Sequence, residues 1–110
     1  MKVSVTVLLG IGGTGVEIYQ DIAVRMAPVS ENEVRSMAVG LRGSRLLSGY
    51  RGSRPVDMDR LTQLVVRFSD LMMEMADRIE SIDLNPVMCS EKECIVADAR
   101  IMLAGTDVQR

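Results

Sequence analysis

The sequence predicts an α+β domain, in which an antiparallel or mixed β-sheet of about five strands carries two helices packed on one face. Two observations lead to this fold class. Alternating apolar and polar residues, which are typical of strands, occur in the first 26 residues and again between 82 and 103. Between these regions, apolar residues recur at helical spacing in two segments. We expect residues 1–103 to form one domain with an open, polar second sheet face, and residues 104–110 to form a flexible tail.

The N-terminal part is predicted to contain three strands. The run 3–9 is rich in β-branched residues and forms the first strand. A glycine-rich loop follows, and apolar residues at even positions then favour a β-hairpin over 16–26. A three-residue turn that ends at Ile22 places Glu17 opposite Arg25 on the polar face of this hairpin.

Two helices follow the hairpin. Ser30 and Glu33 have the spacing of a capping box, which predicts a short amphipathic helix that ends near Gly40. The segment 42–56 is rich in glycine and arginine and is predicted to be a loop. Asp57 is a suitable N-cap for a long helix whose apolar face extends over about five turns and covers the sheet.

The C-terminal part is predicted to be a hairpin with a polar face. If its turn lies at residues 91–92, Asn85 lies opposite Asp98 and Asp83 lies opposite Arg100. The other face is apolar and carries Ile82, Leu84 and Met88 against Ile95, Ala97, Ala99 and Ile101. Oxygen donors that converge on one sheet face suit a hard cation, so Asp83, Asn85 and Asp98 are candidate metal ligands. The alternative interpretation is the solvated face of an edge hairpin.

Composition excludes several classes of function. The net charge is −2, and only three aromatic residues are present, so we expect neither nucleic-acid binding nor attraction to an anionic membrane. No apolar run approaches membrane-spanning length. The chain has no histidine, which excludes histidine catalysis and phosphohistidine chemistry within it. Cys89 and Cys94 suit a reducing cytoplasm as free thiols, although a cross-strand disulfide is geometrically conceivable.

Two loops have alternative interpretations. Gly10, Gly12 and Gly15 match the spacing of a dinucleotide-binding loop, but that motif requires a helix after the third glycine, and the sequence there alternates as a strand. The loop is either a simple strand connection or a segment whose amides at Gly12 and Gly13 approach a phosphate. The arginine-rich loop is either solvated or a site for phosphate or nucleic acid.

Four motifs in this order resemble one enzyme family, the ADP-forming acyl-CoA synthetases. The matching segments are Gly10–Glu17 with Asp21–Pro28, Leu46–Gly52 with Pro55–Asp57, Ile82–Val87, and Ala97–Ile101. The resemblance covers nearly the whole chain and corresponds to the C-terminal part of the ATP-grasp domain. The β subunit of succinyl-CoA synthetase is a more distant relative of the same type.

The resemblance implies a role in a ligase that converts acyl-CoA, ADP and phosphate to acid, CoA and ATP. It implies ATP or ADP and Mg²⁺ as cofactors, with Asn85 and Asp98 as metal ligands and Asp83 beside them. It also implies that Glu17 and Arg25 face the same cleft, where Arg25 helps to hold phosphate. Part of the family's machinery does not match this sequence, so we expect the isolated chain to be inactive and to bind nucleotide weakly or not at all.

The expected partners follow from that difference. They are a nucleotide-binding half and a CoA-binding subunit with the phosphohistidine, so the chain is interpreted as part of a split enzyme, a relic or a fragment. The alternative is a non-catalytic, stand-alone interaction module or homodimer, in which the exposed sheet face is an interface.

Overall fold

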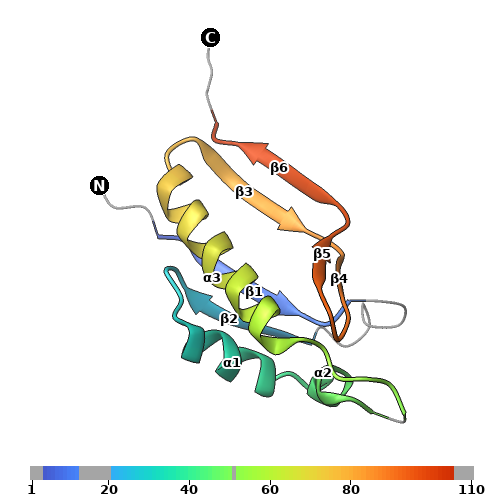
Figure 1. The fold of residues 1–110 in the computed structure, drawn as a ribbon. Helices are drawn as coiled ribbons and strands as arrows, with labels where there is room; N and C mark the ends of the chain where they lie inside the picture. Colours follow the sequence, from blue (N-terminus) through green and yellow to red (C-terminus); the bar gives the residue numbers. More distant parts are fainter. Residues whose placement is uncertain (1–3, 13–20, 51, 106–110) are drawn as a thin grey trace.

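A computed structural model describes residues 4–12, 21–50 and 52–105. Three antiparallel strand pairs and three helices make up this described part of the chain (Figure 1). Their bounds are β1 Thr6–Gly10, β2 Ile22–Met26, α1 Glu31–Val39, α2 Ser44–Ser48, α3 Met58–Met75, β3 Ile79–Leu84, β4 Val87–Cys89, β5 Cys94–Val96 and β6 Ala99–Leu103. The α+β class with antiparallel strands is confirmed. The predicted loop at 42–56 contains the short helix α2, and the predicted strand at 16–20 lies outside the described residues.

Both long helices begin where the sequence predicts. The Ser30 hydroxyl accepts from the Glu33 amide at 3.1 Å, and the Ser30 amide donates to Glu33 Oε1 at 3.0 Å, which completes the capping box of α1. Asp57 Oδ1 accepts from the Arg60 amide at 3.1 Å at the start of α3. These side chains pair backbone amides that have no partner within the helix. None of the helices in the described ranges is long and apolar enough to cross a membrane.

The core lies between the β1–β2 pair and the two long helices. It is built from apolar residues of β1, the segment before α1, α1 itself and α3, namely Val7, Val29, Val34, Met37, Leu61 and Val65. The Val29 amide donates to the buried Ser69 hydroxyl at 2.9 Å, which ties the segment before α1 to α3. The helices therefore cover one face of this strand pair (Figure 1), as the sequence predicts.

Strand β2 differs from its prediction in partner and in orientation. It pairs with β1, so Val7 lies opposite Arg25, and Ile22 lies in the strand rather than in a turn. Ala23 packs against the core, whereas Val24 is 46% exposed and Met26 is 57% exposed. Ala23 and Ala27 thus lie on the face that packs against the core, and Val24 and Met26 lie on the open face. The prediction of a polar open face is therefore wrong for β1–β2.

The C-terminal hairpin has the predicted register. Asp83 pairs with Arg100 in β3–β6, and Met88 pairs with Ile95 in β4–β5. The hairpin is interrupted at its middle, because Pro86 has no amide hydrogen to donate to the ladder. The strands on either side of this interruption form two separate pairs, with β3–β6 at the base and β4–β5 at the tip (Figure 1).

The two parts of the hairpin turn different faces toward the core. In β3, Ile82 and Leu84 are half-buried, but in β4 the half-buried residues are Val87 and Cys89. Met88 is 59% exposed, so its predicted place on the apolar packed face is wrong. The alternation that holds within each strand is reset at the interruption, which a strict period of two cannot anticipate.

Candidate functional site

The candidate metal ligands lie around the interruption of the hairpin. The Asn85 amide donates to the Asp98 carbonyl at 3.1 Å, and Asp83 lies opposite Arg100 two positions along the hairpin. All four of these residues are exposed. The three predicted metal ligands therefore lie on the same exposed part of the hairpin, in the register that the sequence predicts.

The side chains of this set fit a hard cation by their chemistry. Asp98 Oδ1 accepts from the Ala99 amide at 2.9 Å, which orients the carboxylate. Within the described ranges, the Asp83 carboxylate has no hydrogen bond or ion pair and is open to a ligand. No group of three or more Cys, Asp or Glu that could hold a metal occurs in the described residues. The candidate set is thus two carboxylates and the Asn85 amide oxygen, which suits Mg²⁺ because this ion keeps several waters.

Arg25 is not joined to this set. Its Nη1 donates to the Val24 carbonyl at 2.9 Å, and the residue is half-buried on the strand face that packs toward the helices. No hydrogen bond or ion pair in the described part of the chain links Arg25 to the hairpin residues. Its predicted partner Glu17 lies outside the described residues.

The loop after β1 is anchored by an aspartate that sequence reasoning had assigned to a turn. The Ile11 amide donates to the Asp21 carbonyl at 3.2 Å. The Asp21 carboxylate accepts from the amides of Arg42 and Gly43, each at 2.7 Å. A Cβ on Gly43 would lie 3.2 Å from this carboxylate and 3.1 Å from Ile11, so the close approach favours glycine there. The acidic residue after a glycine-rich loop was the only sequence signal for this anchor.

Gly12 is exposed in the described part of the chain. A Cβ built on it would have no heavy atom of the described residues within 4 Å. A ligand could therefore approach its backbone, whereas Gly13 lies outside the described residues. The dinucleotide-binding alternative required a helix over 16–26. Residues 22–26 form the strand β2 instead, which contradicts that helix, and residues 16–20 lie outside the described residues.

In the arginine-rich loop, Arg54 forms an ion pair with Glu91, with Nε 3.1 Å from Oε1. This pair joins the loop to the tip of the hairpin across the surface. Because its charge already has a partner, Arg54 does not support a phosphate or nucleic-acid site in this loop.

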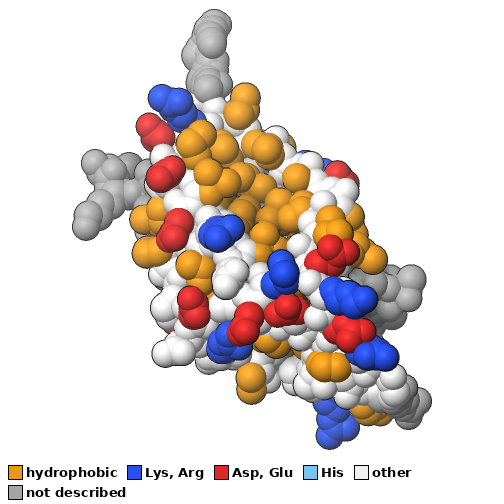
Figure 2. Space-filling view, in the orientation of Figure 1, with side chains coloured by type: hydrophobic (Ala, Val, Ile, Leu, Met, Phe, Trp, Pro, Cys, Tyr) orange, Lys and Arg blue, Asp and Glu red, His pale blue; other side chains and the backbone are white. Residues whose placement is uncertain are grey.

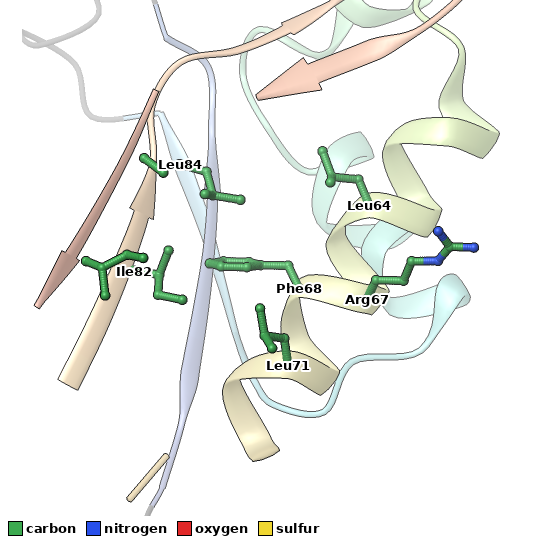
Figure 3. Close-up of a pocket in the computed structure, with 8 residues that line it drawn as sticks. Leu64, Arg67, Phe68, Leu71, Ile82 and Leu84 are labelled. Carbon is green, nitrogen blue, oxygen red and sulfur yellow. The ribbon is translucent and has the colours of Figure 1, made fainter. Parts of the chain in front are cut away.

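An apolar cavity of about 320 Å³ separates α3 from β3 and β6, and sequence reasoning missed it. Figure 2 shows hydrophobic side chains gathered between these elements. In Figure 3, Phe68 points from α3 toward Ile82, while the guanidinium of Arg67 points away. Leu84 also lines the cavity, so by strand alternation Asp83 lies on the opposite face of β3. The sequence predicts the apolar face of the long helix and the apolar face of the hairpin. The cavity between these two faces depends on how far apart the elements pack.

Known proteins are similar to this chain in sequence. The ADP-forming acetate–CoA ligase II subunit beta of Pyrococcus furiosus is 35% identical over 101 residues, which cover 90% of this chain and 43% of that relative. The ADP-forming 4-hydroxybutyrate–CoA ligase of Nitrosopumilus maritimus is 35% identical over 99 residues, or 88% of this chain and 14% of the relative. This chain thus spans less than half the length of these curated relatives.

Solved structures agree with the sequence comparison. Acetyl-coenzyme A synthetase 1 of Ca. Korarchaeum cryptofilum, in a complex with coenzyme A and Mg-AMPPCP, is 38% identical, and the match covers 90% of this chain and 46% of that one. The TM-score of this match is 0.84. The ATP-grasp domain family matches residues 4–103. All the strands and helices described above fall within these residues. Because this match covers nearly the whole chain, the chain belongs to the ATP-grasp domain family.

Proposed function

We propose that this chain supplies the metal- and phosphate-binding side of the nucleotide site of an ADP-forming acyl-CoA synthetase. The single observation that carries the proposal is the hairpin register, in which Asp83, Asn85 and Asp98 gather at one exposed interruption. A solved relative that holds a magnesium–nucleotide analogue has the same fold at 38% identity, which supports this class of ligand.

The proposed roles follow from the chemistry of the side chains. Asp98 and Asn85 provide oxygen ligands to Mg²⁺, and Asp83 orients water in the same coordination sphere or binds directly. When bound, Mg²⁺ neutralises phosphate charge during phosphoryl transfer. Arg25 is proposed to hold phosphate, together with Glu17 as a polar partner. The amides of Gly12 and Gly13 are proposed to approach the nucleotide phosphates.

A titration of the isolated chain tests the metal site. Backbone amide signals of Asn85 and Asp98 are followed by NMR while Mg²⁺ is added with ADP present. We expect these signals to shift at millimolar metal, because half of the nucleotide site is contributed from elsewhere and binding is weak. Unchanged signals at saturating Mg²⁺, with a well-dispersed spectrum, would contradict the site.

A mixing experiment tests the partners. The proposed partners are a nucleotide-binding half and a CoA-binding subunit that carries the phosphohistidine, since the chain itself has no histidine. Adding these portions of a related synthetase to the chain is expected to produce ADP-dependent formation of ATP from acetyl-CoA and phosphate. Failure of both association and activity would count against the proposal.

A second candidate function rests on a different observation. The open face of β1–β2 carries Leu8, Ile22, Val24 and Met26, each at least 46% exposed. Among the described residues of β1 and β2, this face carries no charged side chain, so two copies can meet there without like-charge repulsion between these strands. The candidate is a non-catalytic homodimer. Light scattering would detect it, and Val24→Lys is expected to dissociate it while Val39→Lys, on the exposed side of α1, leaves it intact. A monomer at all concentrations would exclude it.

A further inference from the structure

The two cysteines of the chain face each other across the β4–β5 pair. Cys89 and Cys94 are direct partners in the register, and both are free thiols. Both side chains are half-buried and packed against the hydrophobic core. Neither residue belongs to the proposed nucleotide site.

The position of the pair in the ladder decides how close the two backbones come. The Ser90 amide donates to the Glu93 carbonyl at 2.8 Å, so the pair next to the cysteines is hydrogen-bonded. Because hydrogen-bonded and non-hydrogen-bonded pairs alternate, Cys89 and Cys94 form a non-hydrogen-bonded pair. The Cα atoms of such pairs are about 4.5 Å apart, near the lower end of the range of about 4.4–6.8 Å that disulfides span. The sulfur atoms can therefore be joined without moving the strands.

The tip of this hairpin is held in place by contacts that do not involve sulfur. The Ser90 carbonyl accepts from the Asp57 amide at 2.9 Å, at the start of α3. The Ser90 hydroxyl accepts from the amides of Lys92 and Glu93, at 3.1 and 3.2 Å. These contacts keep the two thiols facing each other in the reduced protein, so little conformational entropy is lost when they are joined.

We propose that Cys89 and Cys94 are a reversible modification site that forms an intramolecular disulfide by exchange with small-molecule disulfides such as oxidised glutathione. In the first step, one cysteine thiolate attacks the disulfide of glutathione, which releases one reduced glutathione and leaves a mixed disulfide. The second cysteine then attacks the protein sulfur and releases the other glutathione. The two cysteines lose two electrons and two protons, and one glutathione disulfide becomes two thiols.

Two properties of the pair make the exchange slow and reversible. Burial, the hydrogen bond to Cys94 and the charge of Cys94 raise the pKa of Cys89 to about 12, so this thiol is protonated at neutral pH and attacks slowly. Both cysteines are only half-buried, and a partly exposed disulfide is more easily reduced. The dithiol form is thus expected in a reducing compartment, and the disulfide when the glutathione pool becomes oxidised.

The experiment equilibrates the full chain with mixtures of reduced and oxidised glutathione, followed by alkylation and mass spectrometry. We expect a monomeric product that resists alkylation and is lighter than the reduced chain by about 2 Da, for the two hydrogens lost. Dithiothreitol is expected to restore both thiols. The same mixtures applied to the chain in denaturant should produce at least about tenfold less of this product, because unfolding separates the thiols.

A matched control moves the thiols by one position. In a Cys89→Ser/Cys94→Ser background, Met88→Cys and Ile95→Cys place two cysteines at the neighbouring pair of opposed positions. This is a hydrogen-bonded pair, whose Cα atoms are about 5.5 Å apart and whose side chains lie farther from each other than those of the native cysteines. Circular dichroism establishes that the variant is folded. We expect the native pair to close at a more reducing glutathione ratio than the denatured chain does and than the displaced pair does, because its side chains lie closer together. Dominant glutathione adducts, disulfide-linked dimers, or equal yields from folded and denatured wild-type chains would overturn the proposal.

Discussion

The amide of Asn85 donates to the carbonyl of Asp98 at 3.1 Å, so the two principal candidate metal ligands are hydrogen-bond partners across the hairpin. This bond lies beside one from the Ala97 amide to the Pro86 carbonyl at 3.0 Å. A regular antiparallel ladder does not place such bonds at adjacent pairs, because hydrogen-bonded pairs alternate with open ones. At the interruption, the side chains of Asn85 and Asp98 are therefore exposed, although their backbones remain hydrogen-bonded to each other.

The metal site predicts a specific effect of one carboxylate. Asp98→Ala removes an oxygen ligand and is expected to weaken the binding of Mg²⁺ with ADP at least about tenfold, or about 1.4 kcal/mol. Asp70→Ala, an exposed carboxylate on α3, is the matched control and should change the affinity little. Isothermal titration or NMR measures both variants, and equal affinities would remove Asp98 from the site.

Two buried hydroxyls on α3 predict opposite effects on stability. Ser69 and Thr62 are both 0% exposed, but among the described residues only the Ser69 hydroxyl has a partner, the Val29 amide. Ser69→Ala leaves that amide unpaired and is expected to cost about 1–3 kcal/mol in the free energy of unfolding.

Thr62 is the matched control for Ser69. Its Oγ1 is buried without a hydrogen-bond partner in the described part of the chain. Thr62→Val keeps the shape and removes the unpaired hydroxyl, so stability should stay the same or rise. Urea unfolding measures both variants, and a larger loss for Thr62→Val than for Ser69→Ala would contradict this account of the core.

The capping box predicts a measurable contribution from Ser30. Ser30→Ala removes the acceptor of the Glu33 amide and is expected to lower the free energy of unfolding by about 1 kcal/mol. Ser36→Ala, at an exposed position inside α1, should be neutral or slightly stabilising because alanine favours helices. Chemical denaturation compares the two, and similar losses would show that the cap is not what stabilises the start of α1.

Cys89 predicts how stability depends on alkaline pH. Burial first, then the hydrogen bond and charge of Cys94, raise the pKa of the Cys89 thiol from 9.0 to about 12. The folded state therefore holds this proton more tightly than the unfolded chain does. The resulting contribution to stability is fully present below pH 9 and is lost as the pH rises toward 12.

Urea unfolding under reducing conditions, from about pH 8 to about pH 10.5, measures this contribution against a Cys89→Ser variant. Other groups that titrate in this range are common to both proteins. We expect the stability of the wild type relative to the variant to fall as the pH rises. A difference that is constant with pH would show that the thiol titrates alike in both states.

Much of the local structure was predictable from the sequence. The capping box at Ser30, the N-cap at Asp57 and the register that pairs Asp83 with Arg100 each depend on residues close in the chain or on a single turn. Such features arise from backbone hydrogen bonding and side-chain spacing, which a sequence displays directly.

Features that depend on how separate helices and strands pack or pair were not predictable in the same way. Val24 and Met26 alternate like a packed strand face, but the face that packs against the core is the one that carries Ala23. Met88 was placed on the wrong face because the alternation is reset at Pro86, where the ladder loses a donor. The first error comes from packing, which overrides local periodicity, and the second comes from the break in the ladder at Pro86.

The sequence by itself determined the fold class, the helix starts, the hairpin register and the set of oxygen donors at Asp83, Asn85 and Asp98. Only the tertiary structure decided which strand partners β2, which faces are left open, and that Cys89 meets Cys94 at the edge of the core. The physical reason is that register depends on local hydrogen bonding and turn position. Burial, by contrast, depends on the distance and angle at which whole elements pack.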